Sequence, residues 1–350
     1  LKDKWSSAMA TLKSSGINIY DIPWMMLIGE PQSGKTTTLR KSGLDFPIGR
    51  DALSGAGGTV NCDWWFTNDA VVIDTAGRFT MPVDSAPDRE EWHAFLKLLS
   101  KYRPKCPINS IVVTIPVTSF IDDTPQVIQD KADKIKDKLL EITDVLGVEY
   151  PVYIMISKSD LIKGFADFCA SLSSIENTQI LGWNSGTDPI PFDREKFSVQ
   201  FENLAQRFYK WSLRRLRDLP VGNEADRIFT FPANFRKIKD KLELYLNHIF
   251  KADKFHSRLI HRGCFFSSGL QEGQAIVKAL NDVETQGASE FASSFTRSRP
   301  YFIYNFYKKV FLENGLVRRV GNVTRRERNL KLSAIAFACL FCIVSVWYLW

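Results

Sequence analysis

Residues 29–38 read GEPQSGKTTT and fit the pattern G-x-x-x-x-G-K-[ST]. In a loop of this pattern, backbone N–H groups surround a chain of phosphates, because the glycines carry no side chain that would block their approach. The lysine reaches the outer phosphates and the threonine hydroxyl binds Mg²⁺. The pattern therefore predicts a P-loop. The predicted cofactor contacts in it are Gly29, Glu30, Pro31, Gln32, Ser33, Gly34, Lys35, Thr36 and Thr37, with Thr36 also a metal ligand.

The apolar runs on either side of this loop predict the layers of the fold. PWMMLIG, residues 23–29, predicts a buried strand that ends at the loop, and residues 36–43 then predict a helix. INSIVVTIPV at residues 108–117 and PVYIMIS at residues 151–157 predict two more buried strands, with a helical pattern at residues 122–146 between them. Strands that alternate with helices predict an α/β, P-loop GTPase-like fold with a mostly parallel sheet and helices on both faces.

A predicted hairpin carries the next motif. CDWWFTNDAVVIDTAG, residues 62–77, reads as two strands joined at Asn68 and Asp69. Because neighbouring side chains on a strand point to opposite faces, we expect Trp64 and Trp65 to straddle the sheet, one facing inward and one partly outward.

The second half of the chain gives less regular patterns. Residues 197–218 and 236–251 predict amphipathic helices, residues 227–235 and 263–269 predict short strands, and residues 301–314 predict an aromatic-rich helix. The predicted organisation is a linker or amphipathic helix at 1–20, a P-loop NTPase-like domain at 21–270 with a helical insertion at about 190–255, a helical extension with a basic juxtamembrane segment at 271–331, and a transmembrane helix at 332–350.

Two further motifs follow the P-loop in the order that P-loop GTPases require. DTAG ends a predicted strand, where Asp74 holds Mg²⁺ through water and the Gly77 N–H meets the γ-phosphate. SKSD follows a later strand and resembles the guanine motif [NT]-K-x-D, in which Asp160 accepts the N–H groups of the guanine edge and Lys158 lies along the base. Ser157 stands where that motif has Asn or Thr, so GTP and ATP, each with Mg²⁺, both stay open.

Two residues beside these motifs are candidates for catalysis. Thr59 lies in the small-residue loop before the hairpin, and it is either an ordinary loop threonine or a switch-loop ligand of Mg²⁺ and the γ-phosphate. Arg78 follows DTAG directly, where many GTPases have a glutamine that orients water. An arginine stabilises developing charge but does not orient water as glutamine does. We therefore expect hydrolysis to be slow or to need a residue from a partner.

The contact on the far side of the base is open between two segments. SSG at residues 267–269 and PANF at residues 232–235 are rival candidates, because each follows a predicted short strand. The sequence does not decide between them.

Charge and hydropathy at the end of the chain favour a membrane over nucleic acid. The net charge is +7, and a basic cluster stands immediately before an apolar segment. Leu332–Trp350 has no charged residue and, at about 1.5 Å per residue, spans roughly 28 Å, close to the ~30 Å hydrocarbon core. The positive-inside rule places the preceding residues in the cytoplasm. The cluster consists of Arg318, Arg319, Arg325, Arg326, Arg328 and Lys331.

Four longer stretches are more specific than the P-loop pattern. They are PWMMLIGEPQSGKTTTLRKSGLDFP, GGTVNCDWWFTNDAVVIDTAGRF, EWHAFLKLLSKYRPKCPINSIVVTI and RGCFFSSGLQEG. Together they resemble the IcmF/TssM family, inner-membrane proteins of type VI secretion systems with relatives in type IVB systems. The resemblance runs from about residue 20 to the end of the chain.

The resemblance implies an architecture and a set of partners. Family members carry two N-terminal membrane helices, a cytoplasmic NTPase-like region, a third membrane helix and a large periplasmic part. This chain resembles the cytoplasmic region plus the third helix, at the bacterial inner membrane. The implied partners are a TssL-like inner-membrane protein, a TssJ-like lipoprotein bound through the periplasmic part, baseplate components and further copies of the chain, without nucleic acid.

Two functions of different classes are therefore open. One is a scaffold of a secretion membrane complex whose nucleotide site regulates assembly, and the other is a membrane-anchored GTPase enzyme in protein targeting. Many IcmF/TssM members have degenerate P-loops, whereas this sequence keeps the complete pattern and Asp74. The hairpin motif and the C-terminal membrane helix favour the scaffold. SKSD favours GTP, while the family is often described as using ATP.

Overall fold

The structure is a computed structural model that describes most of the region between residues 18 and 320. The described residues are 10, 16, 18–47, 62–80, 86–186, 192–220, 222–251, 259–269, 300–320 and 333. Thr59, most of residues 1–20 and the predicted membrane helix at 332–350, apart from Ser333, lie outside them. Within these ranges no helix combines the length and the apolar character that a membrane span needs.

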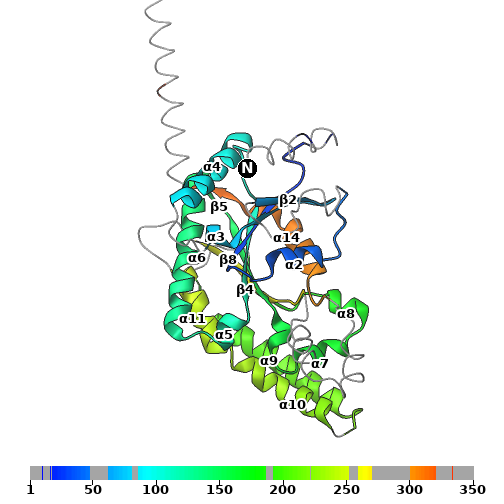
Figure 1. The fold of residues 1–350 in the computed structure, drawn as a ribbon. Coiled ribbons are helices and arrows are strands. Elements are labelled where there is room, and N and C mark those ends of the chain that lie inside the picture. The colour runs from blue at the N-terminus through cyan, green and yellow to red at the C-terminus, as the bar shows by residue number, and fades with distance from the viewer. Residues whose placement is uncertain are drawn as a thin grey trace, which may run out of the picture.

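A seven-stranded sheet organises the described region, in the order β2-β3-β1-β4-β6-β8-β7. The five inner strands are parallel, and the two edge strands, β2 and β7, run antiparallel to their neighbours. The predicted mostly parallel sheet is therefore confirmed (Figure 1). The strands are β1 (Trp24–Gly29), β2 (Cys62–Phe66), β3 (Val71–Thr75), β4 (Ser110–Pro116), β6 (Pro151–Ser157), β7 (Gly182–Asn184) and β8 (Ile260–Phe266).

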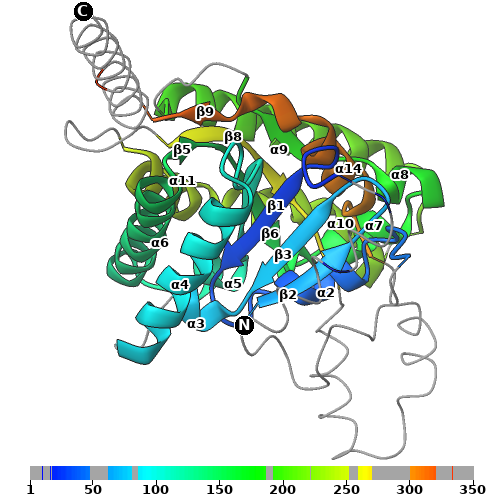
Figure 2. The same cartoon turned by 90° about the horizontal axis from the view of Figure 1, so that it is seen from above.

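Helices cover both faces of this sheet, as the alternation of strands and helices predicts (Figure 2). Apolar side chains from α4, α6, α7, α9, α10 and α11 join one buried cluster, and those of α2 and α14 join the cluster on the other face. The helices are α2 (Lys35–Arg40), α3 (Gly77–Thr80), α4 (Ala86–Tyr102), α5 (Thr118–Ile121), α6 (Pro125–Leu146), α7 (Phe165–Ala170), α8 (Ser174–Thr178), α9 (Arg194–Leu216), α10 (Asn223–Arg236), α11 (Lys239–Phe250) and α14 (Tyr304–Leu312).

The β2–β3 hairpin forms as predicted, with antiparallel register from Cys62 opposite Thr75 to Phe66 opposite Val71. Trp64 and Trp65 do point to opposite faces, but both are buried, at 3% and 5% exposed. The expectation that one is partly exposed is wrong, because helices cover both faces of this sheet.

One predicted strand is a helix instead. Residues 227–235, RIFTFPANF, lie within α10. Their aromatic residues alternate as in a strand, but the buried side chains lie at helical spacing. They are Ile228, Phe231, Pro232 and Phe235. Phe229 is 61% exposed. The alternation misleads because it counts an exposed phenylalanine as a core residue.

Residues 18–22 and 318–320 both lie at the amino-terminal end of the parallel strands. A small antiparallel pair joins β5 (Val148–Glu149) to β9 (Arg318–Arg319), and the Val320 N–H donates to the Gly147 carbonyl at 3.0 Å. Nearby, Arg103 donates to the carbonyls of Ile19 and Ile22 at 2.8 and 3.2 Å. The P-loop lies at the opposite, carboxyl-terminal end of these strands, because it follows the last residue of β1.

Candidate functional site

A cavity of about 600 Å³ opens where β1, β3 and β6 end. It brings together the P-loop, the DTAG segment and Lys158, three motifs that are far apart in the sequence. Ligands of open α/β sheets bind at this edge, outside the carboxyl ends of the strands. The lining residues are Pro31, Gln32, Ser33, Gly34, Lys35, Thr36, Thr37, Thr75, Ala76, Gly77, Arg78 and Lys158.

The P-loop takes a shape that its glycines permit. Gly34 has φ 81° and caps α2. Gln32, with φ 57°, is one of three non-glycine residues with positive φ in the described part of the chain. Gly29 has φ 153°, and a Cβ there would lie 2.1 Å from the Thr114 carbonyl oxygen of β4. Gly77 of DTAG lies against the same loop, since a Cβ on it would lie 2.7 Å from the Pro31 Cα. The two motifs are thus in direct backbone contact.

The Lys35 side chain is buried within the P-loop. Its Nζ donates to the carbonyls of Gly29 and Glu30 at 3.2 and 3.1 Å, and a longer contact of 3.5 Å joins it to Ser33 Oγ. Burial lowers the pKa of Lys35, and the nearby carboxylates of Asp74 and Glu30 oppose that shift. Two carbonyls therefore hold the ammonium group, and the long third contact is the one that a phosphate oxygen can replace.

Thr36 and Asp74, two of the three predicted metal ligands, lie in contact. Thr36 Oγ1 donates to Asp74 Oδ2 at 2.5 Å, and Asp74 is fully buried. A hydroxyl and a carboxylate are oxygen donors of the kind Mg²⁺ prefers, and Mg²⁺ usually keeps several waters and needs few protein ligands. These residues fit Mg²⁺. No group of three or more histidine, cysteine, aspartate or glutamate side chains suited to a metal occurs among the described residues.

Asp63 is a site neighbour that the motif search does not find. It lies opposite Asp74 in the β2–β3 register and is 3% exposed. Directly opposite residues of an antiparallel pair share one face of the sheet, so two carboxylates lie on the face that carries α2. The sequence contains the information that locates Asp63, because a turn centred on Asn68 and Asp69 places Asp63 opposite Asp74.

SKSD contributes to the site through its first two residues. Lys158 lines the cavity in a left-handed conformation, with φ 56°. Ser157 Oγ donates to the Ser33 carbonyl at 2.6 Å, so the serine that replaces Asn or Thr ties β6 to the P-loop. Asp160 does not line the cavity, and its carboxylate accepts a hydrogen bond from Ser268 Oγ.

The rival base-contacting segments occupy different places. Ser268, of SSG, contacts Asp160, and Gly269 packs against the start of α2, with its Cβ position 3.2 Å from the Thr38 Cα. PANF lies inside α10, where Asn234 donates to the Lys163 carbonyl at 3.3 Å. The geometry therefore favours SSG.

Arg78 stands at the rim of the cavity. Its guanidinium pairs with Asp88 and, at 3.0 Å, with Glu91, both from α4, and lies 4.6 Å from the centre of the Phe79 ring. The side chain is 37% exposed. Glu30, by contrast, points its carboxylate away from the cavity, and only its carbonyl takes part in the loop.

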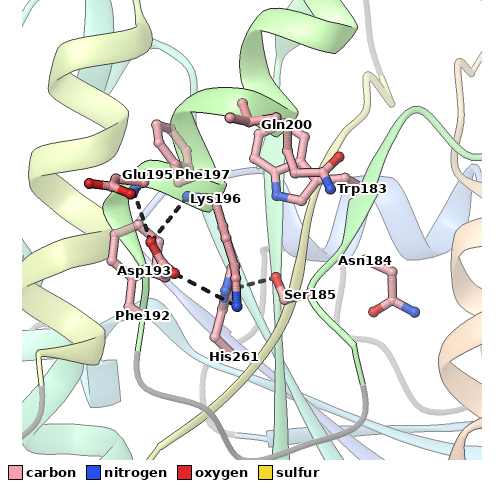
Figure 3. Close-up of a pocket in the computed structure, with 11 residues that line it drawn as sticks. Trp183, Asn184, Ser185, Phe192, Asp193, Glu195, Lys196, Phe197, Gln200 and His261 are labelled. Atoms are coloured by element: carbon pink, nitrogen blue, oxygen red, sulfur yellow. Dashed lines mark hydrogen bonds and ion pairs between the residues drawn. The ribbon is translucent and has the colours of Figure 1, made fainter.

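A second cavity, of about 400 Å³, lies at the other edge of the sheet (Figure 3). Its walls come from β7, the first turns of α9 and the start of β8, and they include the aromatic rings of Trp183, Phe192 and Phe197. His261 lies at its base, and its Nδ1 is 3.1 Å from Ser185 Oγ. Burial lowers the pKa of His261 to about 4. None of the sequence motifs reaches this cavity.

Comparison with known proteins gives the family. The IcmF-related N-terminal domain matches residues 85–338. The type VI secretion system component TssM1 of Pseudomonas aeruginosa is 34% identical over 367 aligned residues, which include 99% of this chain. The chain belongs to the IcmF/TssM family. The recognition from sequence is confirmed, and the chain spans about a third of the length of that relative, 33%.

Solved structures similar to this IcmF/TssM chain include several GTPases. The GDP-bound G-domain of FeoB from S. thermophilus covers 65% of this chain and 98% of its own, at 15% identity and a TM-score of 0.27. The small GTPase SAR1 from Encephalitozoon cuniculi, in complex with GDP, covers 40% and 50%, at 14% identity and a TM-score of 0.26. Scores this low carry no argument, so the fold assignment rests on the strand order and the P-loop itself.

Proposed function

We propose that this chain is the nucleotide-binding cytoplasmic region of a type VI secretion inner-membrane component. The observation that carries the proposal is the cavity that joins the P-loop, DTAG and Lys158. Lys35 contacts the outer phosphates, Thr36 and Asp74 hold Mg²⁺, and Gly77 meets the terminal phosphate. The relative named as a type VI secretion system component supports the setting.

GTP is the preferred nucleotide in this proposal, with ATP as the alternative. Lys158 lines the cavity, and Asp160 lies two residues further on, outside that lining and bonded to Ser268. In this proposal the Asp160 carboxylate accepts hydrogen bonds from the guanine edge. Ser268, which contacts Asp160, then completes the base pocket. Adenine offers an amino group but lacks guanine's N1–H, so Asp160 is the residue that would separate the two bases.

Hydrolysis is slow in this proposal, and the nucleotide acts as a regulator of assembly. Arg78 is engaged by Asp88 and Glu91, so it must leave those carboxylates before it can stabilise charge on a terminal phosphate. Thr59, the other catalytic and metal candidate, remains a prediction. The protein anchors a membrane complex of several copies with TssL-like and TssJ-like partners and contacts the baseplate. Family membership supports this role over a targeting enzyme.

Calorimetry tests the proposal. The 350-residue chain in detergent is titrated with GTP and with ATP in the presence of Mg²⁺, and we expect saturable binding that Lys35→Ala abolishes. Lys41→Ala is the matched control, because Lys41 is exposed and lies outside the cavity. Asp160→Ala should weaken GTP binding and leave ATP binding unchanged. Absence of binding to both nucleotides would contradict the proposal.

A further inference from the structure

Glu30, the first variable residue of the P-loop, is anchored in the protein interior. Its side chain is 5% exposed and its carboxylate accepts hydrogen bonds from three other side chains. Ser119 Oγ donates to its two oxygens at 3.0 and 2.9 Å, Lys131 Nζ donates at 2.7 Å, and the Tyr245 hydroxyl donates at 2.9 Å. The Glu30 carboxylate is therefore turned away from the predicted phosphate site, and both of its oxygens accept hydrogen bonds.

The three donors come from three separate helices. Ser119 belongs to α5, Lys131 to α6 and Tyr245 to α11, so the P-loop is fastened to the helical layer on one face of the sheet. Burial lowers the pKa of Lys131, but hydrogen bonds to Asp123 and Glu30 outweigh this effect and raise the pKa above its ordinary value. Burial also raises the pKa of Tyr245, with Glu30 adding to the shift. Both groups therefore keep their protons and donate to Glu30.

The same residue holds the phosphate-binding lysine. The backbone carbonyl of Glu30 accepts a hydrogen bond from Lys35 Nζ at 3.1 Å, and the Ser33 N–H donates to that carbonyl at 3.2 Å. Fixing the Glu30 side chain thus fixes the carbonyl that positions Lys35. An uncompensated carboxylate this close to the loop would also repel phosphates, because charges interact strongly in a buried setting. Lys131 supplies a compensating charge, which it shares with Asp123, because the same Nζ donates to Asp123 Oδ2 at 2.6 Å.

We propose that Lys131, with Tyr245 and Ser119, is a positioning group for the nucleotide site. It holds Glu30, and through the Glu30 carbonyl it holds Lys35, while its charge offsets that of the loop carboxylate. This inference rests on the proposed nucleotide binding. It assigns a role in that binding to α6 and α11, neither of which contributes a residue to the cavity lining.

Nucleotide titration of Lys131 variants in the full chain tests the inference. Lys131→Met should raise the Kd for Mg²⁺–GTP by about tenfold or more, and the Kd for Mg²⁺–GDP by less, because repulsion grows with the net negative charge of the complex. Lys131→Arg should restore binding. The double variant Glu30→Gln with Lys131→Met should recover affinity to within about threefold of wild type, because it removes the carboxylate that needs compensation.

Two controls separate positioning from general damage. Lys134→Met removes an exposed lysine from the next turn of α6 and should leave both Kd values unchanged. Tyr245→Phe keeps the ring in the core, removes one hydrogen bond to Glu30, and should raise the GTP Kd a few-fold even if Lys131→Met does not fold. Wild-type affinity in Lys131→Met and Tyr245→Phe, or equal losses for GTP and GDP without recovery in the double variant, would overturn this inference alone. Failure of the wild type to bind any nucleotide would overturn both proposals.

Discussion

The cavity at the P-loop and the cavity at β7 and α9 are built from different parts of the polypeptide. The P-loop cavity is shaped by backbone, through residues in left-handed conformations, a buried lysine held by carbonyls and a glycine packed against the loop. The cavity at β7 and α9 is shaped by aromatic side chains around a buried histidine. The P-loop cavity can be predicted from the sequence, because it requires particular residues at fixed spacing. The other leaves no such pattern.

The largest expected difference between the two cavities is in their tolerance of a methyl group. Gly29→Ala should prevent folding, because the new Cβ would lie 2.1 Å from a backbone oxygen of β4. Gly186→Ala, beside the second cavity, meets no described residue within 4 Å, so its φ of 92° is what opposes the change, at about 1–2 kcal/mol. Soluble expression and chemical denaturation measure both. A stable Gly29→Ala protein would show that the loop is not held as described.

Removing an aromatic wall should separate stability from nucleotide binding. Phe197 is 3% exposed and packs beside Trp183, with ring centres 5.7 Å apart. Phe197→Ala should destabilise the protein by about 3–5 kcal/mol, the usual cost of removing a buried phenylalanine ring. The nucleotide Kd of the folded fraction should not change, because this edge of the sheet is remote from the P-loop. A changed Kd would show that the two cavities are coupled.

The buried histidine of the second cavity should also make the free energy of unfolding fall in acid. Burial lowers the pKa of His261 to about 4, with the charge of Arg262 adding to the shift and a hydrogen bond to Gly263 opposing it. An unfolded histidine titrates near ~6.5, so the unfolded state binds the proton first, and stability falls as pH drops from about 6.5 toward 4. The loss between pH 7 and pH 5 should be on the order of 2 kcal/mol.

Denaturation at the two pH values, with His261→Gln, checks this prediction. The variant should lack that part of the pH dependence, while the control His248→Gln, which replaces a histidine that contacts Asp133 on α6, should retain it. Equal pH dependence in wild type and His261→Gln would rule out the buried histidine as its source.

The smallest predicted effect is at the junction of β6 and the P-loop. Ser157→Ala removes the 2.6 Å hydrogen bond to the Ser33 carbonyl and should cost about 1 kcal/mol of stability. Nucleotide affinity should fall a few-fold, because the loop loses one of its fixed points. Ser159→Ala is a matched control, since its hydroxyl bonds to the Ile156 carbonyl and not to the loop. If Ser157→Ala binds as wild type does, this contact only supports the fold.

The sequence predicts those parts of the molecule that follow from local rules. The apolar runs give the inner strands, the Asn68–Asp69 turn gives the hairpin, and the P-loop pattern gives the edge where the cavity lies. The strand predicted from the alternating aromatics in residues 227–235 is wrong, because these residues form a helix, and a helix buries only every third or fourth residue. Motif spacing also says nothing about Glu30, whose carboxylate is turned inward by a lysine about a hundred residues away.

Side-chain partners from distant elements are therefore what the sequence leaves out. Asp160 belongs to a recognisable motif, yet its hydrogen bond to Ser268 depends on how β6 and β8 pair in the folded sheet. Arg78 follows DTAG, yet its engagement with Asp88 and Glu91 depends on where α4 packs. Both contacts decide what the site can do, and neither follows from spacing along the chain.

The shared attachment of residues 18–22 and 318–320 to the segment around Arg103 has a mechanical consequence. Residues 18–22 and 318–320 are both held against the segment around Arg103 and Pro104, through Arg103 on one side and Arg319 on the other. A pulling force that enters through one of these segments and leaves through the other crosses only this short junction. The parallel strands and the P-loop at their far end stay outside the loaded path. A pulling force applied between these two segments would therefore load the hydrogen bonds of the junction before it loads the phosphate-binding loop.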